Sequence, residues 1–286
     1  MHDDRADLMD APRFQGVINE LASASRTAVD LAASYNEYYG TGLYERRYPR
    51  PNPNMVRLIR GLLPPGGRAL DFGCGSGRYL RPLLASKAQI VAYDISEVAL
   101  RELKYRHRVA VMTGQLCPVG GTLDELVAAV PERSLDLVVM VFGVLGHIRG
   151  EATRLDTLRR LSRLIRPGGH LMATVPNAER RFAAEQAASA PLIARGDLEP
   201  GDILYQRHSA EGPVMMYYHL FTPDGFTELL EAAGLDVQSF GAESMMPERA
   251  VLGLPFGALV DRGLMKLLRW QNAYGFTAVA TPRCAD

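Results

Sequence analysis

Short apolar runs alternate with amphipathic stretches along most of the chain. The runs are rich in Val, Ile and Leu and are bounded by Gly, Pro or charged residues, a pattern typical of buried strands. The expected strands are residues 68–71, 89–94, 109–113, 135–142, 170–175, 236–241 and 276–280. Between them apolar residues recur at helical spacing, and the expected helices are residues 79–86, 96–106, 123–130, 151–166 and 223–233. This alternation predicts an α/β fold with a mostly parallel sheet of seven strands and helices on both faces.

Three segments lie outside the alternation. Residues 1–54 form an N-terminal extension, expected to be helical around residues 14–33, and residues 55–286 form the main domain. Two inserts interrupt that domain, at about residues 177–218 after the fifth strand and at about residues 242–273 between the last two strands. Ligands of open α/β sheets bind outside the carboxyl ends of the strands, where extra segments become walls and lids. We therefore expect the extension to act as a lid and the inserts to help close a pocket.

Composition and charge narrow the function classes. The chain has 286 residues, and its 32 Lys and Arg balance 32 Asp and Glu, so it has no overall attraction for nucleic acid or an anionic membrane. Its three cysteines, Cys74, Cys117 and Cys284, are widely spaced and favour neither a disulfide framework nor a metal site. The longest apolar run, residues 137–145, is far shorter than the about 20 residues of a transmembrane helix. We expect a soluble cytoplasmic protein without a bound metal.

The candidate chemistry begins in the stretch "ALDFGCGSGRYL". Three glycines, Gly73, Gly75 and Gly77, follow an expected strand and precede an expected helix, so backbone N–H groups face a ligand there. The dinucleotide pattern G-x-G-x-x-G fails, because Arg78 or Leu80 stands where its last glycine belongs. Asp71, just ahead of the turn, would be poorly placed beside a pyrophosphate. Its carboxylate suits a ligand with a positively charged amino group.

Four stretches in this order resemble the class I S-adenosylmethionine-dependent methyltransferases. They are "LDFGCGSG", "IVAYDIS", "SLDLVVMVFGVLGHI" and "RLIRPGGHLMATVPN". The resemblance covers roughly residues 68–176, resumes at residue 219, and implies a Rossmann-like sheet with S-adenosylmethionine as the cofactor. It also implies an enzyme that transfers a methyl group.

The resemblance assigns roles to the residues that match its motifs. Asp71 and the turn of Gly73, Cys74, Gly75 and Gly77 would hold the methionine end of the cofactor, and Asp94 would accept the ribose hydroxyls. Ile95 would line the adenine. Gln115 would replace an acidic residue that often follows the third strand in this family. Phe142 and Gly143 would face the sulfur.

Two histidines are candidate general bases. His147 follows the fourth expected strand, and His219 lies in "MMYYHLF". Each has a structural alternative, with the imidazole bonded within the fold. We also expect Tyr39, Tyr44 and Tyr218, together with His219, to line the acceptor chamber, because their segments attach at the carboxyl edge of the sheet.

The methyl acceptor is open at this point. The stretches "YERRYPRPNP" and "YYHLF" resemble the tRNA wobble-uridine carboxymethyl methyltransferases, with Arg46, Arg47 and Arg50 interleaved with Tyr44 and Tyr48. The neutral net charge and the long inserts favour a small molecule in a closed pocket, which is our first hypothesis. A tRNA acceptor is the alternative, and a cofactor-binding partner protein without turnover is a third. The insert at 242–273 is apolar enough to cap a hydrophobic substrate, pack a homodimer or touch a membrane surface. The choice between O-, N- and C-methylation is also open.

Overall fold

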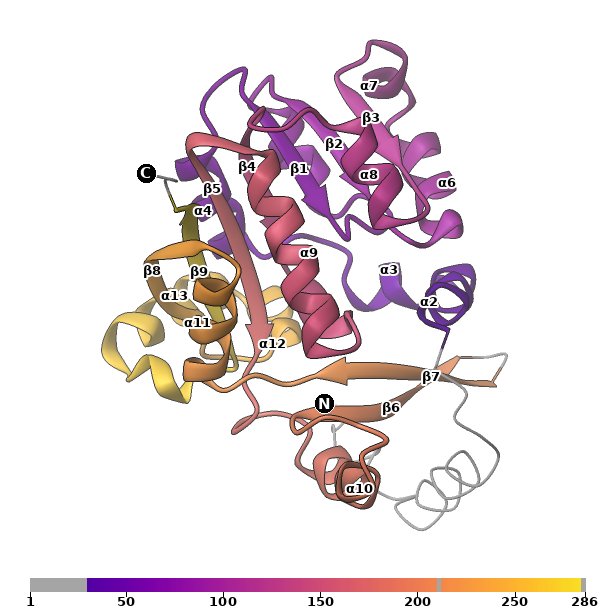
Figure 1. Cartoon of the computed structure of the whole chain (residues 1–286), viewed down its shortest axis with the longest axis vertical. Helices are drawn as coiled ribbons and strands as arrows, with labels where there is room; N and C mark the ends of the chain where they lie inside the picture. The colour runs from indigo at the N-terminus through magenta and orange to yellow at the C-terminus, as the bar shows by residue number, and fades with distance from the viewer. Residues whose placement is uncertain (1–29, 210–211, 284–286) are drawn as a thin grey trace.

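A seven-stranded sheet forms the centre of the protein (Figure 1). The structure, a computed structural model, describes residues 30–209 and 212–283. The strand order is β3-β2-β1-β4-β5-β9-β8, and only β9 runs antiparallel to its neighbours. The bounds are β1 Arg68–Phe72, β2 Gln89–Tyr93, β3 Leu116–Val119, β4 Leu135–Met140, β5 Ile165–Pro176, β8 Leu235–Ser244 and β9 Gly275–Pro282. This confirms the predicted Rossmann-like α/β class.

Helices cover both faces of the sheet, since side chains alternate along each strand. One face packs Leu70 and Val138 against α8, α9 and α11, and the other packs Ala69 and Val139 against α4, α5 and α6. The bounds are α4 Pro53–Leu62, α5 Leu80–Leu84, α6 Glu97–Arg106, α7 Arg108–Met112, α8 Leu123–Ala129, α9 Glu151–Leu164 and α11 Pro223–Ala232. No helix within the described ranges is both long and apolar enough to cross a membrane.

The third strand is not where the sequence pattern placed it. Residues 109–113 were expected to be a strand, but they belong mainly to α7, and β3 begins at Leu116. Only one side of α7 packs against the core, through Ala110 and Val111, whereas Val109 is 67% and Met112 84% exposed. The chain reverses only at Gly114, where φ is 71°. A strand parallel to β2 can start only after that turn, which moves β3 later in the sequence.

The added segments gather beyond the carboxyl ends of the parallel strands. The first insert contains α10 (Ala183–Ala194) and the antiparallel pair β6 (Asp202–Ser209) and β7 (Gly212–His219). Figure 1 shows this pair crossing below the sheet, with α2 (Leu31–Gly40) and α3 (Leu43–Arg47) beside it. The expected helix at residues 14–33 lies almost wholly outside the described residues. These segments therefore stand where walls and a lid were expected.

The second insert forms helices at the β8 end of the sheet. It contains α12 (Glu248–Gly253), α13 (Gly257–Leu267) and the short helix η3 (Trp270–Asn272). Phe256 and Leu267 are largely exposed on this insert. Its suggested roles in a homodimer, as a substrate cap or at a membrane stay predictions.

Candidate functional site

A cavity of about 1580 Å³ lies between the carboxyl edge of the sheet, the α2–α3 segment and the β6–β7 pair. Ligand pockets usually measure about 300–1,000 Å³, so this chamber has room for a cofactor and an acceptor together. The sheet supplies one wall, through Asp71, Cys74, Asp94 and Phe142. Tyrosines from α2, α3 and β7 supply much of the opposite wall.

The glycine turn brings backbone to the chamber wall. Gly73, Gly75 and Gly77 all have positive φ, at 74°, 54° and 94°, which disfavours any residue with a Cβ. A Cβ on Gly75 would also lie 2.2 Å from the Tyr39 hydroxyl oxygen. Gly73 and Cys74 line the chamber, whereas Gly75 and Gly77 shape the turn behind them. The turn thus packs closely against neighbouring side chains, and its Gly73–Cys74 part borders the cavity.

Two buried carboxylates stand beside this turn. Asp71 is buried, and its Oδ2 atom has no hydrogen-bond partner among the described residues. Burial, with a smaller effect from Asp94, raises the pKa of Asp71 to about 7. Asp94 accepts hydrogen bonds from the Gly75 N–H at 2.7 Å and the Ser96 N–H at 2.8 Å. Burial outweighs these bonds and raises the pKa of Asp94 to about 6.

This donor set fits S-adenosylmethionine. A buried carboxylate that lines a cavity and has no hydrogen-bond partner on one oxygen is stabilised in its charged form by a cation, and the amino group of the methionine moiety is one. The Gly73–Cys74 part of the turn borders the same cavity. Asp94 and Ile95 also line the chamber, and their contacts to ribose and adenine stay predictions.

Gln115 does not join these residues, and its expected adenine contact is wrong. It precedes β3 instead of following it, so it lies at the amino edge of the sheet. Its side-chain amide donates to the Leu84 and Ala88 carbonyl oxygens at 3.1 and 3.3 Å. At the carboxyl edge, Leu123 of α8 lines the chamber instead. The misplaced third strand caused this error.

His147 lies in the chamber, in the short helix η2 (Val144–His147) that follows β4. Its Nδ1 atom lies 3.0 Å from the Tyr217 carbonyl oxygen, so Nδ1 carries the proton and donates it there. Burial lowers the pKa of His147 to about 3, despite that bond. The imidazole is therefore neutral, with Nε2 left as an acceptor.

His219 does not line the chamber, so the expectation that it acts as a base beside the acceptor is wrong. Successive β7 side chains point to opposite faces, and Tyr218 takes the chamber side. His219 Nδ1 instead donates to Asp202 Oδ1 at 2.7 Å. Glu199, Asp202 and His219 each bring a ligand atom within 4.8 Å of the others. Arg154, however, already pairs with Glu199 at 2.8 Å, which supplies the positive charge this cluster needs.

The three expected tyrosines all line the chamber. Tyr39 lies against Gly75, and Tyr44 packs edge-on to Phe142 with ring centroids 6.3 Å apart. A Cβ on Gly143 would lie 1.8 Å from the Tyr218 hydroxyl oxygen. Gly143 therefore lets Tyr218 reach the end of β4, where Phe142 also faces the cavity.

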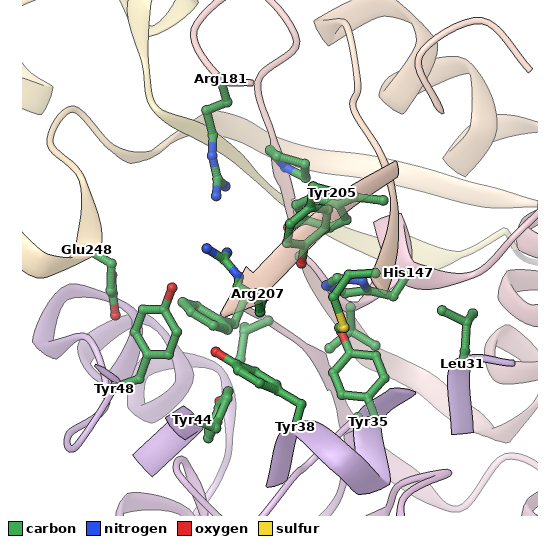
Figure 2. Close-up of a pocket in the computed structure, with 18 of the residues that line it drawn as sticks. Leu31, Tyr35, Tyr38, Tyr44, Tyr48, His147, Arg181, Tyr205, Arg207 and Glu248 are labelled. Atoms are coloured by element: carbon green, nitrogen blue, oxygen red, sulfur yellow. The ribbon is translucent and has the colours of Figure 1, made fainter. Parts of the chain in front are cut away.

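The sequence interpretation missed the charged residues of the chamber. They include Arg78, Arg181, Arg207, Glu243 and Glu248. Figure 2 shows the guanidinium ends of Arg181 and Arg207 pointing into the same part of the cavity, beside Tyr205 and Tyr48. The Arg181 Nε atom has no hydrogen-bond partner among the residues described. The sequence did contain one signal, because Tyr205 and Arg207 alternate and so lie on the same face of a strand. Placing that face toward the cavity, however, requires knowledge of the β6–β7 pairing.

Comparisons with known proteins identify the family of this chain. A family model described as a methyltransferase domain matches residues 44–239. A tRNA (carboxymethyluridine(34)-5-O)-methyltransferase of Schizosaccharomyces pombe is 24% identical over 214 residues, which cover 70% of this chain and 86% of the relative. Mouse tRNA (carboxymethyluridine(34)-5-O)-methyltransferase ALKBH8 is 26% identical over 184 residues, or 62% of this chain. The match spans only 25% of that mouse relative's length.

Solved structures have the same fold. A SAM-dependent methyltransferase from Methanosarcina mazei superposes with a TM-score of 0.60 at 17% identity, covering 80% of this chain and 98% of that one. The family match covers more than half of the chain, and the Asp71 and glycine geometry fits the family's cofactor. The chain belongs to the methyltransferase domain family.

Proposed function

We propose that the protein methylates a carboxylate oxygen, namely that of a carboxymethyl group on the wobble uridine of a tRNA. The observation that carries this proposal is the pair Arg181 and Arg207, which direct their cationic ends into the acceptor part of the chamber. Guanidinium groups match carboxylates in charge and in planar geometry. The names of the relatives support the tRNA acceptor over the small molecule that the sequence favoured.

A carboxylate acceptor suits the rest of the chamber. S-adenosylmethionine, when bound, supplies a methyl group on a positively charged sulfur. A carboxylate oxygen can accept this methyl group without any proton transfer. A general base is needed only when the nucleophile is protonated. His147, kept neutral by burial, therefore acts through position: its Nε2 lone pair and its ring help shape the chamber. The main task of the residues is to hold the acceptor in a dry site.

Aromatic side chains support the entry of a base. Tyr35, Tyr205 and Tyr218 line the chamber near His147, and Tyr218 stacks on that histidine with ring centroids 4.2 Å apart. Single-stranded loops of RNA are commonly recognised by bases that splay out and stack on such rings. A tRNA acceptor also agrees with a cytoplasmic location.

A small carboxylic acid is the second candidate, and one observation favours it. The exposed arginines ahead of the chamber are engaged within the chain, since Arg46 donates to the Thr41 carbonyl at 3.0 Å and Arg50 to the Leu252 carbonyl at 2.9 Å. Tyr44 and Tyr48 line the chamber and pack near Phe142, so they do not form an outer stacking platform. The expected basic and aromatic RNA contact at residues 44–50 is thus weaker than the sequence suggested.

The test is methyl transfer from labelled S-adenosylmethionine to four acceptors. They are tRNA carrying carboxymethyluridine, the same tRNA with unmodified uridine, the carboxymethyluridine nucleoside and a panel of small carboxylic acids. We expect labelling of the first, base-labile as a methyl ester, and none of the second. Labelling of small acids alone would support the second candidate, and labelling of an amine or a ring carbon would overturn both.

Variants connect the test to the chamber. Arg181→Met and Arg207→Met should raise KM for the acceptor about tenfold or more each, because a hydrogen bond to a charged group contributes about 1.5–3 kcal/mol. Arg163→Met, an exposed arginine on α9, is the matched control and should leave KM unchanged. If both chamber variants keep the parental KM, the arginines do not hold the acceptor.

A further inference from the structure

Exposed cations gather on α6 and the start of α7, outside the chamber. Arg101, Lys104 and Tyr105 are spaced at i, i+3 and i+4, which puts them on one face of α6. Arg108 continues the group as the first residue of α7. All four are exposed, Tyr105 to 71%. We call these four residues the α6 basic surface.

The charge of this surface is not compensated locally. Residues 97–115, from the start of α6, contain four Lys or Arg and two Asp or Glu, in a chain whose overall charge is zero. Of the two acids, Glu97 and Glu102, the second is paired with Arg106 at 2.6 Å. Arg101, Lys104 and Arg108 make no ion pair within the described part of the chain. Three free cations therefore stand beside one exposed aromatic ring.

The surface is connected to the lid of the chamber. α6 begins at Glu97, three residues after Asp94, and the Ser96 hydroxyl donates to Asn36 Oδ1 of α2 at 2.8 Å. Figure 1 shows α2 lying below the starting end of α6. With ten residues α6 is about 15 Å long, at 1.5 Å per residue. A chain of phosphates that leaves the chamber past α2 can follow α6 directly.

We propose that the backbone of the anticodon arm of the tRNA lies along the α6 basic surface while the modified base enters the chamber; this rests on the proposed function. Arg101, Lys104 and Arg108 contact phosphates and position the arm, and Tyr105 stacks on an exposed base or covers a sugar. Charge complementarity selects this occupant, because a polyanion is what unpaired cations around an aromatic ring bind best. The surface replaces residues 44–50 as the main RNA contact.

The experiment compares two triple variants of the full chain. One is Arg101→Ala/Lys104→Ala/Arg108→Ala, and the control is Arg163→Ala/Lys266→Ala/Arg269→Ala, which removes three exposed cations from α9, α13 and the segment after it. Affinity for tRNA is measured by fluorescence anisotropy from 50 to 200 mM salt. Methyl transfer to tRNA and to the carboxymethyluridine nucleoside is measured beside it. Calorimetric titration with S-adenosylmethionine confirms that both variants are folded.

The expected result is specific to the first variant. The slope of log affinity against log salt should shrink by about 2–3, since each phosphate contact contributes about 0.7–0.9. tRNA affinity should fall at least tenfold, while transfer to the nucleoside stays at the parental rate. Tyr105→Ala should weaken tRNA binding with no change in the salt slope. The control variant should bind and methylate tRNA like the parent.

Other outcomes separate the two proposals. If the parent methylates tRNA and the first variant matches it, the α6 surface is wrong and the proposed function stands. Equal losses of tRNA affinity in both triple variants would also overturn the α6 surface, because they would indicate unspecific charge attraction. If the parent neither binds nor methylates tRNA, the proposed function fails with the inference. The surface would belong to an acidic protein if the parent methylates tRNA and the first variant still binds tRNA but no longer binds that protein.

Discussion

The imidazole of His147 lies nearly flat on the ring of Tyr218, with centroids 4.2 Å apart and planes inclined by 15°. The stack and the bond from Nδ1 to the Tyr217 carbonyl oxygen hold the imidazole in one orientation. The same burial that allows this contact lowers the pKa of His147 to about 3. A histidine held in this way forms a rigid part of the chamber lining and is a weak base.

The first prediction concerns this histidine. His147→Asn should reduce the transfer rate by no more than about tenfold, because an aromatic pair contributes about 0.5–1.5 kcal/mol. The pH profile of kcat between pH 5 and 9 should keep its shape, as His147 does not titrate there. Steady-state kinetics across that range is the measurement. A loss of about a hundredfold or more, with a changed acidic limb, would instead identify a general base.

The second prediction concerns Asp71. Asp71→Asn should weaken S-adenosylmethionine binding by about 1.5–3 kcal/mol, because the variant replaces a charged partner of the cofactor's amino group by a neutral one. Calorimetric titration at pH 8 measures the change. Asp136→Asn is a suitable control, since that aspartate accepts from the Arg68 N–H at 2.7 Å at the opposite end of β1. Parental affinity in Asp71→Asn would place the cofactor's amino group elsewhere.

The third prediction is a pH dependence of stability. Burial raises the pKa of Asp71 from 3.8 to about 7 and that of Glu243 from 4.5 to about 7. The folded state therefore binds more protons than the unfolded state between these values, and the contribution of both groups to stability falls as pH rises from about 4 to 7. Denaturant unfolding without cofactor should show Asp71→Asn to be more stable than the parent at pH 8, with little difference at pH 4. A parent more stable than the variant at pH 8 would contradict the assignment.

Added cofactor should reverse that order. The amino group of S-adenosylmethionine pairs best with ionised Asp71, so the cofactor should stabilise the parent more at pH 8 than at pH 5. The increase in the free energy of unfolding follows RT ln(1 + [L]/Kd) at a fixed cofactor concentration. Asp71→Asn should lose most of this pH dependence.

The fourth prediction concerns the ion pair of Arg78 and Glu248, which joins the glycine turn to α12. Arg78 also donates from Nε to the Arg50 carbonyl at 2.8 Å and lies 4.5 Å from the centre of the Phe142 ring. Glu248→Ala leaves a buried cation without its partner and should lower the free energy of unfolding by about 3–5 kcal/mol. Asp236→Ala, which breaks an exposed and solvent-screened pair with Arg283, should have a much smaller effect. Equal effects of the two changes would show that the Arg78 pair is solvated.

The cofactor side of the site was predictable because its residues are tied to strand ends. Asp71 lies in β1 and Asp94 directly follows β2, so the strand pattern alone carried both to the same edge of the sheet. The prediction for Gln115 was wrong because the third strand was placed too early by a few residues. The apolar residues of α7 resemble a strand in composition, and only the position of the turn at Gly114 decides between the two structures.

The acceptor side was predictable only in part. Tyr218 and His219 are adjacent, and a shift of one residue in a strand exchanges the two faces. Sequence alone could not choose which one meets the chamber. Arg181 and Arg207 come from an insert whose shape depends on contacts with distant residues, such as the ring of Tyr274 below Arg181. Local patterns do not contain that information.

The β6–β7 pair has a consequence for how such enzymes can change. It leaves the sheet after β5 and rejoins it before α11, and its ends meet where the Ala178 N–H donates to the Phe221 carbonyl at 3.0 Å and the Phe221 N–H to the Pro176 carbonyl at 3.1 Å. The described residues between these points, up to Ser209 and from Gly212 on, lie outside the seven-stranded sheet. Tyr205, Arg207 and Tyr218 therefore belong to one cassette, whose exchange has to keep Tyr218 matched to Gly143 and His147, the residues after β4 that it contacts. Grafting this cassette between relatives is a direct way to transplant acceptor preference.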